Sequence, residues 1–159
     1  MKKGMLLAAL ALVFLTGCGG QTESGGGEDV SLSSLYAAME AACGWGEDYM
    51  TPVEGELLEA YYPGLSELSA RQLVAMVPAM SSDVNEIVLF QGETEEDAAS
   101  AAQLLQARID AQTGGGAWYP ETLAAWEKAA VLRQGTYAAL IASGACQTEL
   151  EEQVSAALS

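Results

Sequence analysis

Apolar side chains recur every three or four positions in several stretches of this chain, a spacing typical of amphipathic helices. Residues 32–43 show it, with a serine placed to cap the start and a glycine to end the helix. Residues 94–112 also show it, and Thr94 and Asp97 match a capping box at the start. Further helical segments are predicted over residues 57–62, 66–72, 120–126 and 148–158, the last with a capping box of Thr148 and Glu151.

Two pairs of apolar runs, each separated by a short turn sequence, predict two β-hairpins. The runs are residues 73–80 and 86–91, joined by Ser81-Ser82-Asp83, and residues 129–133 and 137–143, joined by Gln134-Gly135. Because the run from Ile87 to Phe90 is apolar on both faces, we expect it to lie in a central strand. Thr51-Pro52 is expected to lie in a loop.

The order of these elements predicts an α+β fold. We expect two β-hairpins in one small, mostly antiparallel sheet, with helices packed against it and an N-terminal helix in addition.

The first 17 residues have the layout of a secretory signal peptide. Lys2 and Lys3 give a positively charged N-terminal region, and an unbroken apolar stretch runs from Met5 to Leu15. Small residues follow directly after it, as at a signal-peptide cleavage site. The stretch is too short for a transmembrane helix, which needs about 20 apolar residues. We therefore expect residues 1–17 to be absent from the mature protein.

The signal sequence ends in Leu15-Thr16-Gly17-Cys18, which resembles the lipobox of bacterial lipoproteins. In that motif the cysteine thiol accepts a diacylglyceryl group as a thioether, and small residues before it give a peptidase access to the preceding bond. The resemblance implies cleavage between Gly17 and Cys18 and a lipid on Cys18 that holds the protein to the membrane. The alternative is an ordinary signal peptide whose cleavage site lies near a cysteine.

The segment that follows is expected to be a flexible tether over residues 18–29, because five of the eleven residues from 19 to 29 are glycine. Eleven such residues have an r.m.s. span of about 17 to 20 Å. A single α+β domain is expected over residues 30–159. Removal of the signal peptide leaves four basic residues against 22 acidic ones, a net charge of −18. This charge argues against a nucleic-acid partner and against close contact with anionic lipid head groups.

The chain has no histidine, which excludes Ser-His-Asp and Cys-His catalysis and every histidine-containing metal site. Three cysteines are too few for a four-cysteine zinc site, and we expect no metal and no cofactor. After Cys18, the remaining Cys43 and Cys146 are a candidate disulfide outside the cytoplasm. The alternative is two independent, buried thiols.

Acidic and aromatic residues supply the other candidates, each with a simpler structural explanation. Glu93, Glu95, Glu96 and Asp97 are candidate Ca²⁺ ligands, or carboxylates favoured at a helix N-terminus. Trp118-Tyr119, Tyr61-Tyr62 and Trp45 are a candidate platform for glycans or peptides, or anchors of the core and loops. The pairs Glu54 and Glu56, and Glu151 and Glu152, are candidate general acids and bases, or solvated helix faces.

Four stretches carry a family resemblance: Tyr61-Tyr62-Pro63-Gly64-Leu65, Met76-Val77-Pro78-Ala79-Met80, Asn85-Glu86-Ile87-Val88-Leu89-Phe90 and Gly135-Thr136-Tyr137-Ala138. From about Leu32 to Leu158 the chain resembles a domain-of-unknown-function family, number 4358, of short bacterial lipoproteins. The resemblance implies one domain and an envelope location, and it supplies no catalytic or ligand-binding residues.

We therefore expect a lipid-anchored, non-enzymatic binding or accessory module outside the cytoplasm, on the cell membrane. Its expected partners are the membrane, through the lipid on Cys18, and an envelope protein or ligand that the sequence does not identify. Two alternatives remain open. One is a hydrolase that uses carboxylates on cell-wall or glycan substrates, and the other is a structural subunit of an envelope complex.

Overall fold

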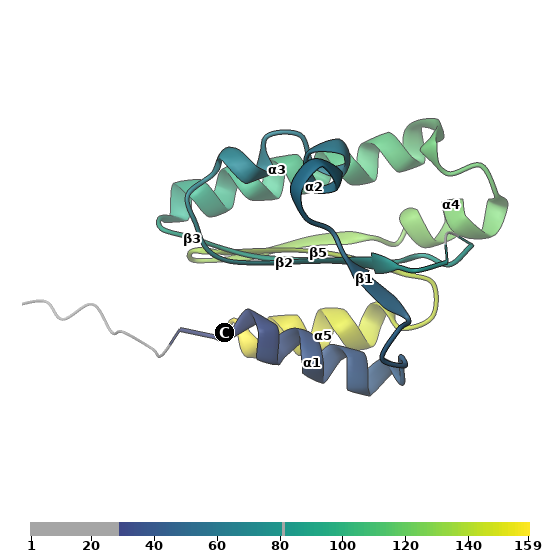
Figure 1. Cartoon of the computed structure of the whole chain (residues 1–159), viewed down its shortest axis with the longest axis horizontal. Helices are drawn as coiled ribbons and strands as arrows, with labels where there is room; N and C mark the ends of the chain where they lie inside the picture. Colours follow the sequence, from purple (N-terminus) through teal and green to yellow (C-terminus); the bar gives the residue numbers. More distant parts are fainter. Residues whose placement is uncertain (1–28, 81) are drawn as a thin grey trace, which may run out of the picture.

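The computed structural model describes residues 29–80 and 82–159, which form three layers. One sheet lies between two layers of helices, with α2, α3 and α4 on one face and α1 and α5 on the other (Figure 1). The predicted signal peptide, the lipobox and the tether up to residue 28 fall outside the described residues. Within the described part of the chain, no helix is both long and apolar enough to cross a bilayer.

The sheet has five strands in the order β1-β2-β3-β5-β4, and all neighbours are antiparallel. The strands are β1 Met50–Pro52, β2 Ala70–Pro78, β3 Asn85–Gly92, β4 Ala130–Gln134 and β5 Tyr137–Ser143. The helices are α1 Leu32–Cys43, α2 Gly55–Tyr61, α3 Glu95–Ala111, α4 Pro120–Trp126 and α5 Gln147–Ala157, with short helical turns η1 Leu65–Glu67 and η2 Gln112–Gly116. The predicted α+β class is confirmed.

The central position of β3 is confirmed, and it explains why this strand is apolar on both faces. Ile87 and Leu89 pack into the cluster that α1 and α5 cover. Val88 and Phe90 pack into the cluster on the α3 face. Successive side chains of a strand point to opposite faces, so one strand supplies both cores, and all four side chains are at most 1% exposed.

Capping explains where two of the helices begin. The Ser31 side chain accepts a hydrogen bond from the Ser34 amide at the start of α1, and Gly44 ends the helix in the left-handed region at φ 66°. Thr94 and Asp97 form the predicted capping box at the start of α3.

Two predicted segments are wrong. Thr51 and Pro52 belong to strand β1 rather than to a loop, because the strand is only three residues long and shows no periodicity. Proline is tolerated there since β1 is an edge strand. The helical segment expected over residues 66–72 shrinks to the single turn η1, since β2 begins at Ala70 and pairs with the end of β3.

The predicted capping box at the last helix is also wrong. Cys146 occupies the N-cap and makes no side-chain cap bond, so Thr148 lies inside α5. The Gln147 side chain holds this start instead. It accepts a hydrogen bond from the Ser143 amide at 2.8 Å and donates one to the Ile141 carbonyl at 3.1 Å.

The described chain enters the domain at one particular end of the sheet. The Val30 amide donates to the Tyr137 hydroxyl at 2.9 Å, and Tyr137 pairs with Gln91 at the end of β3. We call this the entry end of the sheet. The opposite end, where Asn85 pairs with Ser143, holds the β2–β3 connection, and we call it the hairpin end (Figure 1).

Candidate functional site

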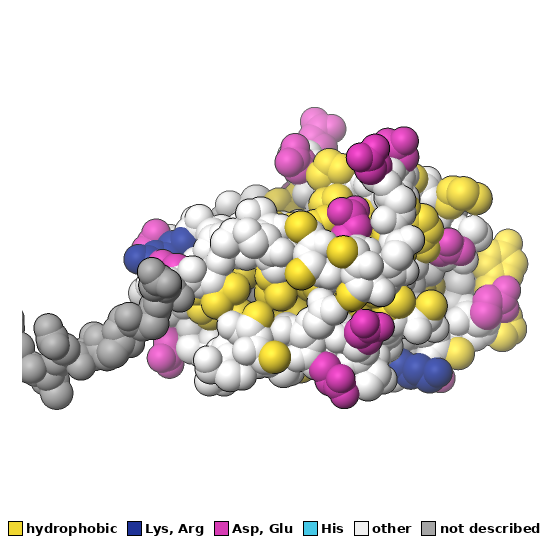
Figure 2. All heavy atoms as spheres, turned by 90° about the horizontal axis from the view of Figure 1, so that it is seen from below, with side chains coloured by type: hydrophobic (Ala, Val, Ile, Leu, Met, Phe, Trp, Pro, Cys, Tyr) yellow, Lys and Arg dark blue, Asp and Glu magenta, His cyan; other side chains and the backbone are white. Residues whose placement is uncertain are grey.

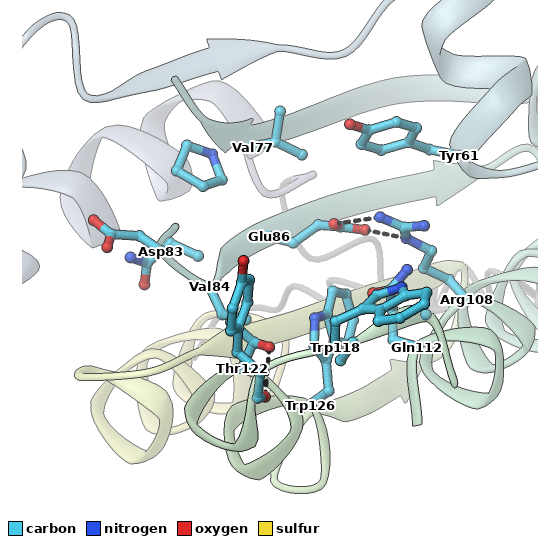
Figure 3. Close-up of a pocket in the computed structure, with 15 residues that line it drawn as sticks. Tyr61, Val77, Asp83, Val84, Glu86, Arg108, Gln112, Trp118, Thr122 and Trp126 are labelled. Atoms are coloured by element: carbon cyan, nitrogen blue, oxygen red, sulfur yellow. Dashed lines mark hydrogen bonds and ion pairs between the residues drawn. The ribbon is translucent and has the colours of Figure 1, made fainter. Parts of the chain in front are cut away.

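A cavity of about 270 Å³ opens at the hairpin end of the sheet, between the β2–β3 connection, α3 and α4. Its volume lies near the lower limit for small-molecule pockets. Figure 3 shows Tyr61 and Val77 on one side, Trp118 and Trp126 on the other, and the Glu86–Arg108 pair between them. Aromatic rings and a few convergent polar groups make this cavity, hereafter the aromatic pocket, the candidate functional site.

A two-pronged ion pair forms the floor of the aromatic pocket. Nε and Nη2 of Arg108 donate to Oε1 and Oε2 of Glu86 at 2.8 and 2.9 Å. The Arg108 and Glu86 side chains are 17% and 6% exposed, so the pair is largely removed from water. Parallel hydrogen bonds between guanidinium and carboxylate fix both side chains as one planar unit.

Local structure explains why these two charged groups meet. Glu86 precedes Val88 by two positions on β3, so both side chains point to the α3 face. Arg108 follows Leu105 by three positions on α3, and therefore lies on the helix face that packs on the sheet. Because these two faces pack against each other, Glu86 and Arg108 form an ion pair at the edge of the core.

Tyr62 is a third member of this buried group. Its hydroxyl donates to Oε1 of Glu86 at 2.5 Å, and the residue is 1% exposed. Burial, followed by the charge of Glu86, raises the pKa of Tyr62 well above its usual range. The phenol therefore remains protonated and serves as a fixed donor to the carboxylate.

Two aromatic rings flank the guanidinium of Arg108. Its central carbon lies 4.5 Å from the ring centroid of Tyr61 and 5.5 Å from that of Trp126, both within the range of cation–π attraction. Burial alone lowers the pKa of Arg108, but the hydrogen bonds and charge of Glu86 outweigh burial and raise it above its ordinary value. Arg108 therefore stays charged and is held rigidly at the pocket floor.

The rim of the aromatic pocket is formed by Trp118 and Tyr119, which are 88% and 68% exposed. They follow the η2 turn, whose Gly115 has φ 129°, a backbone conformation that favours glycine. Pro120 then begins α4 in the predicted place. The glycine-rich turn and the proline thus set where the two aromatic side chains emerge.

The structure brings together part of the predicted aromatic platform. Tyr61, Trp118 and Tyr119 all line the aromatic pocket. Tyr62 does not line the pocket; it is buried, and its hydroxyl donates to Glu86. Trp45 stands apart, stacked on Tyr49 at a centroid distance of 5.7 Å and packed against the core cluster of α1 and α5.

The acidic candidates do not gather at the pocket. Asp97 caps α3, and Glu93 pairs with Arg71 at 3.2 Å near the entry end. Across residues 29–80 and 82–159, no three metal-binding side chains of the Asp, Glu, Cys or His types converge. The pairs Glu54 with Glu56, on α2 and its N-cap, and Glu151 with Glu152, on α5, lie outside the aromatic pocket.

Cys43 and Cys146 are brought together as free thiols, one at the end of α1 and the other at the start of α5. Burial, followed by the hydrogen bond with Cys146, raises the pKa of Cys43 to about 12. The disulfide between them stays a prediction. A thiol count on denatured, unreduced protein tests it, since a bridge leaves neither thiol to react.

The sequence analysis missed the central pair of the site, Glu86 and Arg108, together with Trp126 and Gln112. One signal was available: Arg108 is one of only six basic residues, and it stands beside Ile109 on the apolar side of a helix. Glu86 directly precedes an apolar strand run. A charge within an apolar pattern predicts a buried partner of opposite sign.

A family described as Domain of unknown function (DUF4358) matches residues 45–143. The match confirms the predicted family, number 4358, over most of the expected length of the resemblance. It includes Glu86, Arg108 and Trp118, which belong to the aromatic pocket. No curated protein and no solved structure matches this chain.

Proposed function

This chain belongs to the family Domain of unknown function (DUF4358), and we propose that it is a lipid-anchored binding module of the cell envelope. In this proposal Cys18 carries the lipid, the protein faces away from the cytoplasm, and the aromatic pocket receives a ligand without chemical turnover. The observation that carries the proposal is a pocket with exposed aromatic rings at the hairpin end, opposite to where the chain enters.

Several hydrogen bonds hold the first described residues against the entry end of the sheet. A tether attached to these residues would therefore pull on the domain at this end. Gln72 accepts from the Leu32 amide at 3.0 Å and donates to the Val30 carbonyl at 2.9 Å. Gln91 donates to Asp29 at 2.9 Å. A membrane anchor at Cys18 attached through this point leaves the aromatic pocket directed toward the exterior, where an envelope ligand is accessible.

The surface charge agrees with a domain that stands away from the bilayer. Seen from the side of α1 and α5, acidic side chains are spread over the surface and basic ones are sparse (Figure 2). Anionic head groups repel such a surface, so the lipid rather than the domain makes the membrane contact.

The alternative of a carboxylate hydrolase is less well supported by the pocket. Of its two carboxylates, Glu86 has both oxygens bonded to Arg108 and one of them also to Tyr62. Asp83 accepts a hydrogen bond from the Tyr49 hydroxyl at 3.0 Å. A general acid or base must reach the proton that it transfers. Both oxygens of Glu86 are already hydrogen-bonded within the protein, so this carboxylate is poorly placed to exchange a proton with a substrate.

The alternative of a structural subunit needs a broad apolar surface for its partner. The large apolar side chains that stand exposed in the described residues are Leu57, Met80, Trp118 and Tyr119. Trp118 and Tyr119 are adjacent in sequence and belong to the rim of the aromatic pocket, which favours ligand binding there.

Anchoring is tested by metabolic labelling with an alkyne-tagged fatty acid, followed by cell fractionation. We expect label on the wild-type protein in the membrane fraction and no label on Cys18→Ala. Cys146→Ala, which changes a different cysteine, is the control and should retain the label. A membrane-bound, processed Cys18→Ala protein would contradict the anchoring part of the proposal.

Binding is tested by native mass spectrometry of protein extracted gently from its own membranes. We expect an additional mass on the wild type that is absent from Trp118→Ala and present on Trp45→Phe, whose altered ring lies outside the pocket. A wild-type mass that matches the lipidated chain alone, with nothing added, would contradict ligand binding.

A further inference from the structure

We propose that the aromatic pocket takes one ring of a neutral carbohydrate, an inference that rests on the pocket being the binding site proposed above. It concerns the chemical class of the ligand, which three features of the pocket define: its exposed rings, its unpaired polar groups and its charge balance.

The exposed rings suit a ligand with an apolar face. Trp118 and Tyr119 present large, amphipathic side chains to water beside the pocket opening. The C–H face of a sugar ring packs on such a flat aromatic surface. This contact removes apolar area of both the sugar and the aromatic ring from water. The cavity of about 270 Å³ is small, which suits a single ring better than a long chain.

The unpaired polar groups suit a ligand that carries hydroxyls around its edge. Within the described residues, Nη1 of Arg108, the side-chain amide of Gln112 and the Tyr61 hydroxyl make no hydrogen bond to the protein. Together they offer donors and acceptors around one opening. Sugar hydroxyls both donate and accept, so they match this mixed set.

The charge balance disfavours a charged ligand. Glu86 neutralises Arg108 through two hydrogen bonds, so the pocket floor has no net charge. An anion would approach a chain with a large excess of acidic residues and would meet Asp83 in the pocket lining. A cation would find the Glu86 carboxylate already paired with Arg108, and Asp83 already hydrogen-bonded to the Tyr49 hydroxyl. A neutral ring avoids both costs.

The test is calorimetric titration of the purified protein with neutral trimers of glucose, galactose and N-acetylglucosamine. Two charged trimers, of glucosamine and of galacturonate, are titrated in parallel. We expect saturable binding of at least one neutral trimer, weaker binding of both charged ones, and a loss of about tenfold or more in affinity for Trp118→Ala. Because Trp118 is 88% exposed, this variant should unfold at the wild-type denaturant midpoint. Trp45→Phe should bind like the wild type.

Each other outcome overturns the inference in a defined way. Preferred binding of a charged trimer that still depends on Trp118 would replace the ligand class and leave the pocket as the binding site. Binding that Trp118→Ala does not weaken would place the sugar elsewhere. Binding of no neutral trimer would reject the carbohydrate, whereas the acyl label and the co-purified mass test the proposed function separately.

Discussion

At the scale of single residues, the most consequential feature is a charge pair placed where two apolar patterns meet. Arg108 contacts Glu86, Tyr61 and Trp126, so one side chain links the sheet, the segment around α2, and α4. A buried ion pair adds little net stability over an apolar pair, but the loss of one partner leaves the other charge unpaired. Stability and site geometry therefore depend on the same residue.

Arg108→Ala is expected to destabilise the domain by about 3–5 kcal/mol, because the Glu86 carboxylate is left buried without its counter-charge. Arg133→Ala, at an exposed position of β4, is the control and should change the unfolding free energy by less than about 0.5 kcal/mol. Urea denaturation followed by circular dichroism measures both. A change of under about 1 kcal/mol for Arg108→Ala would mean that Glu86 stays hydrated.

Cys43 predicts a pH dependence of the reduced protein. Its thiol has an ordinary pKa of 9.0 in the unfolded chain and a pKa of about 12 in the fold, mainly because of burial. The raised value means that its contribution to stability is complete below pH 9 and is lost as the pH rises from 9 toward 12. In reductant, the unfolding free energy of the wild type should fall more steeply between pH 8 and about pH 10.5 than that of Cys43→Ala. Parallel curves would contradict the raised pKa.

Sequence predicted the aromatic candidates better than the charged ones, for a physical reason. Trp118 and Tyr119 stand in a polar, glycine-rich segment, where large aromatic residues are conspicuous. Glu86 and Arg108 are 22 positions apart and meet only because a strand face and a helix face are packed together. No spacing rule within one element connects them, so their pairing requires the tertiary structure.

At the scale of elements, prediction succeeded where the periodicity was long and failed where it was short. The 17 residues of α3 and the buried β3 carry strong patterns, and both were found. Strand β1 has only three residues and exists because it pairs with the end of β2. The start of α5 was misplaced because Gln147 makes tertiary hydrogen bonds that a capping motif does not encode.

The junction of β3 and α3 gives a further prediction. A Cβ at Gly92 would lie 2.6 Å from the Asp97 Cβ and 2.9 Å from the Thr94 carbonyl oxygen. Gly92→Ala should therefore force the first turn of α3 away from the sheet and cost about 1–3 kcal/mol. Gly46→Ala is the matched control, because a Cβ there meets nothing within 4 Å and the unfolding free energy should stay near the wild-type value.

Thermal or urea unfolding of the two alanine variants separates the explanations. Equal stability of Gly92→Ala and the wild type would show that the capping box of Thr94 and Asp97 can shift at no cost. A loss confined to Gly92→Ala would show that the close approach at this junction determines where α3 begins.

At the scale of the whole molecule, the two ends of the sheet have different roles in the proposed function. The entry end holds the first described residues, which follow the proposed anchor in sequence, and the hairpin end holds the aromatic pocket. Strand β3 connects them over eight residues, about 26 Å at a rise of about 3.3 Å per residue. If the proposed function is correct, one buried strand separates the attachment end of the domain from the end that binds the ligand.

This separation predicts how the anchored protein is oriented. Gln134, beside the β4–β5 turn at the entry end, and Ser82, in the β2–β3 connection at the hairpin end, are both exposed. Each is changed to cysteine in a background of Cys43→Ala and Cys146→Ala, labelled with the same donor dye, and reconstituted as the lipidated protein in vesicles that carry an acceptor lipid. Energy transfer to the membrane should be weaker from position 82, because the tether pulls at the opposite end.

Cleavage of the lipid from the protein should reduce transfer from both positions to the same low level. Equal transfer from the two anchored proteins would mean that the domain tumbles freely on its tether, and stronger transfer from position 82 would mean that the aromatic pocket faces the bilayer.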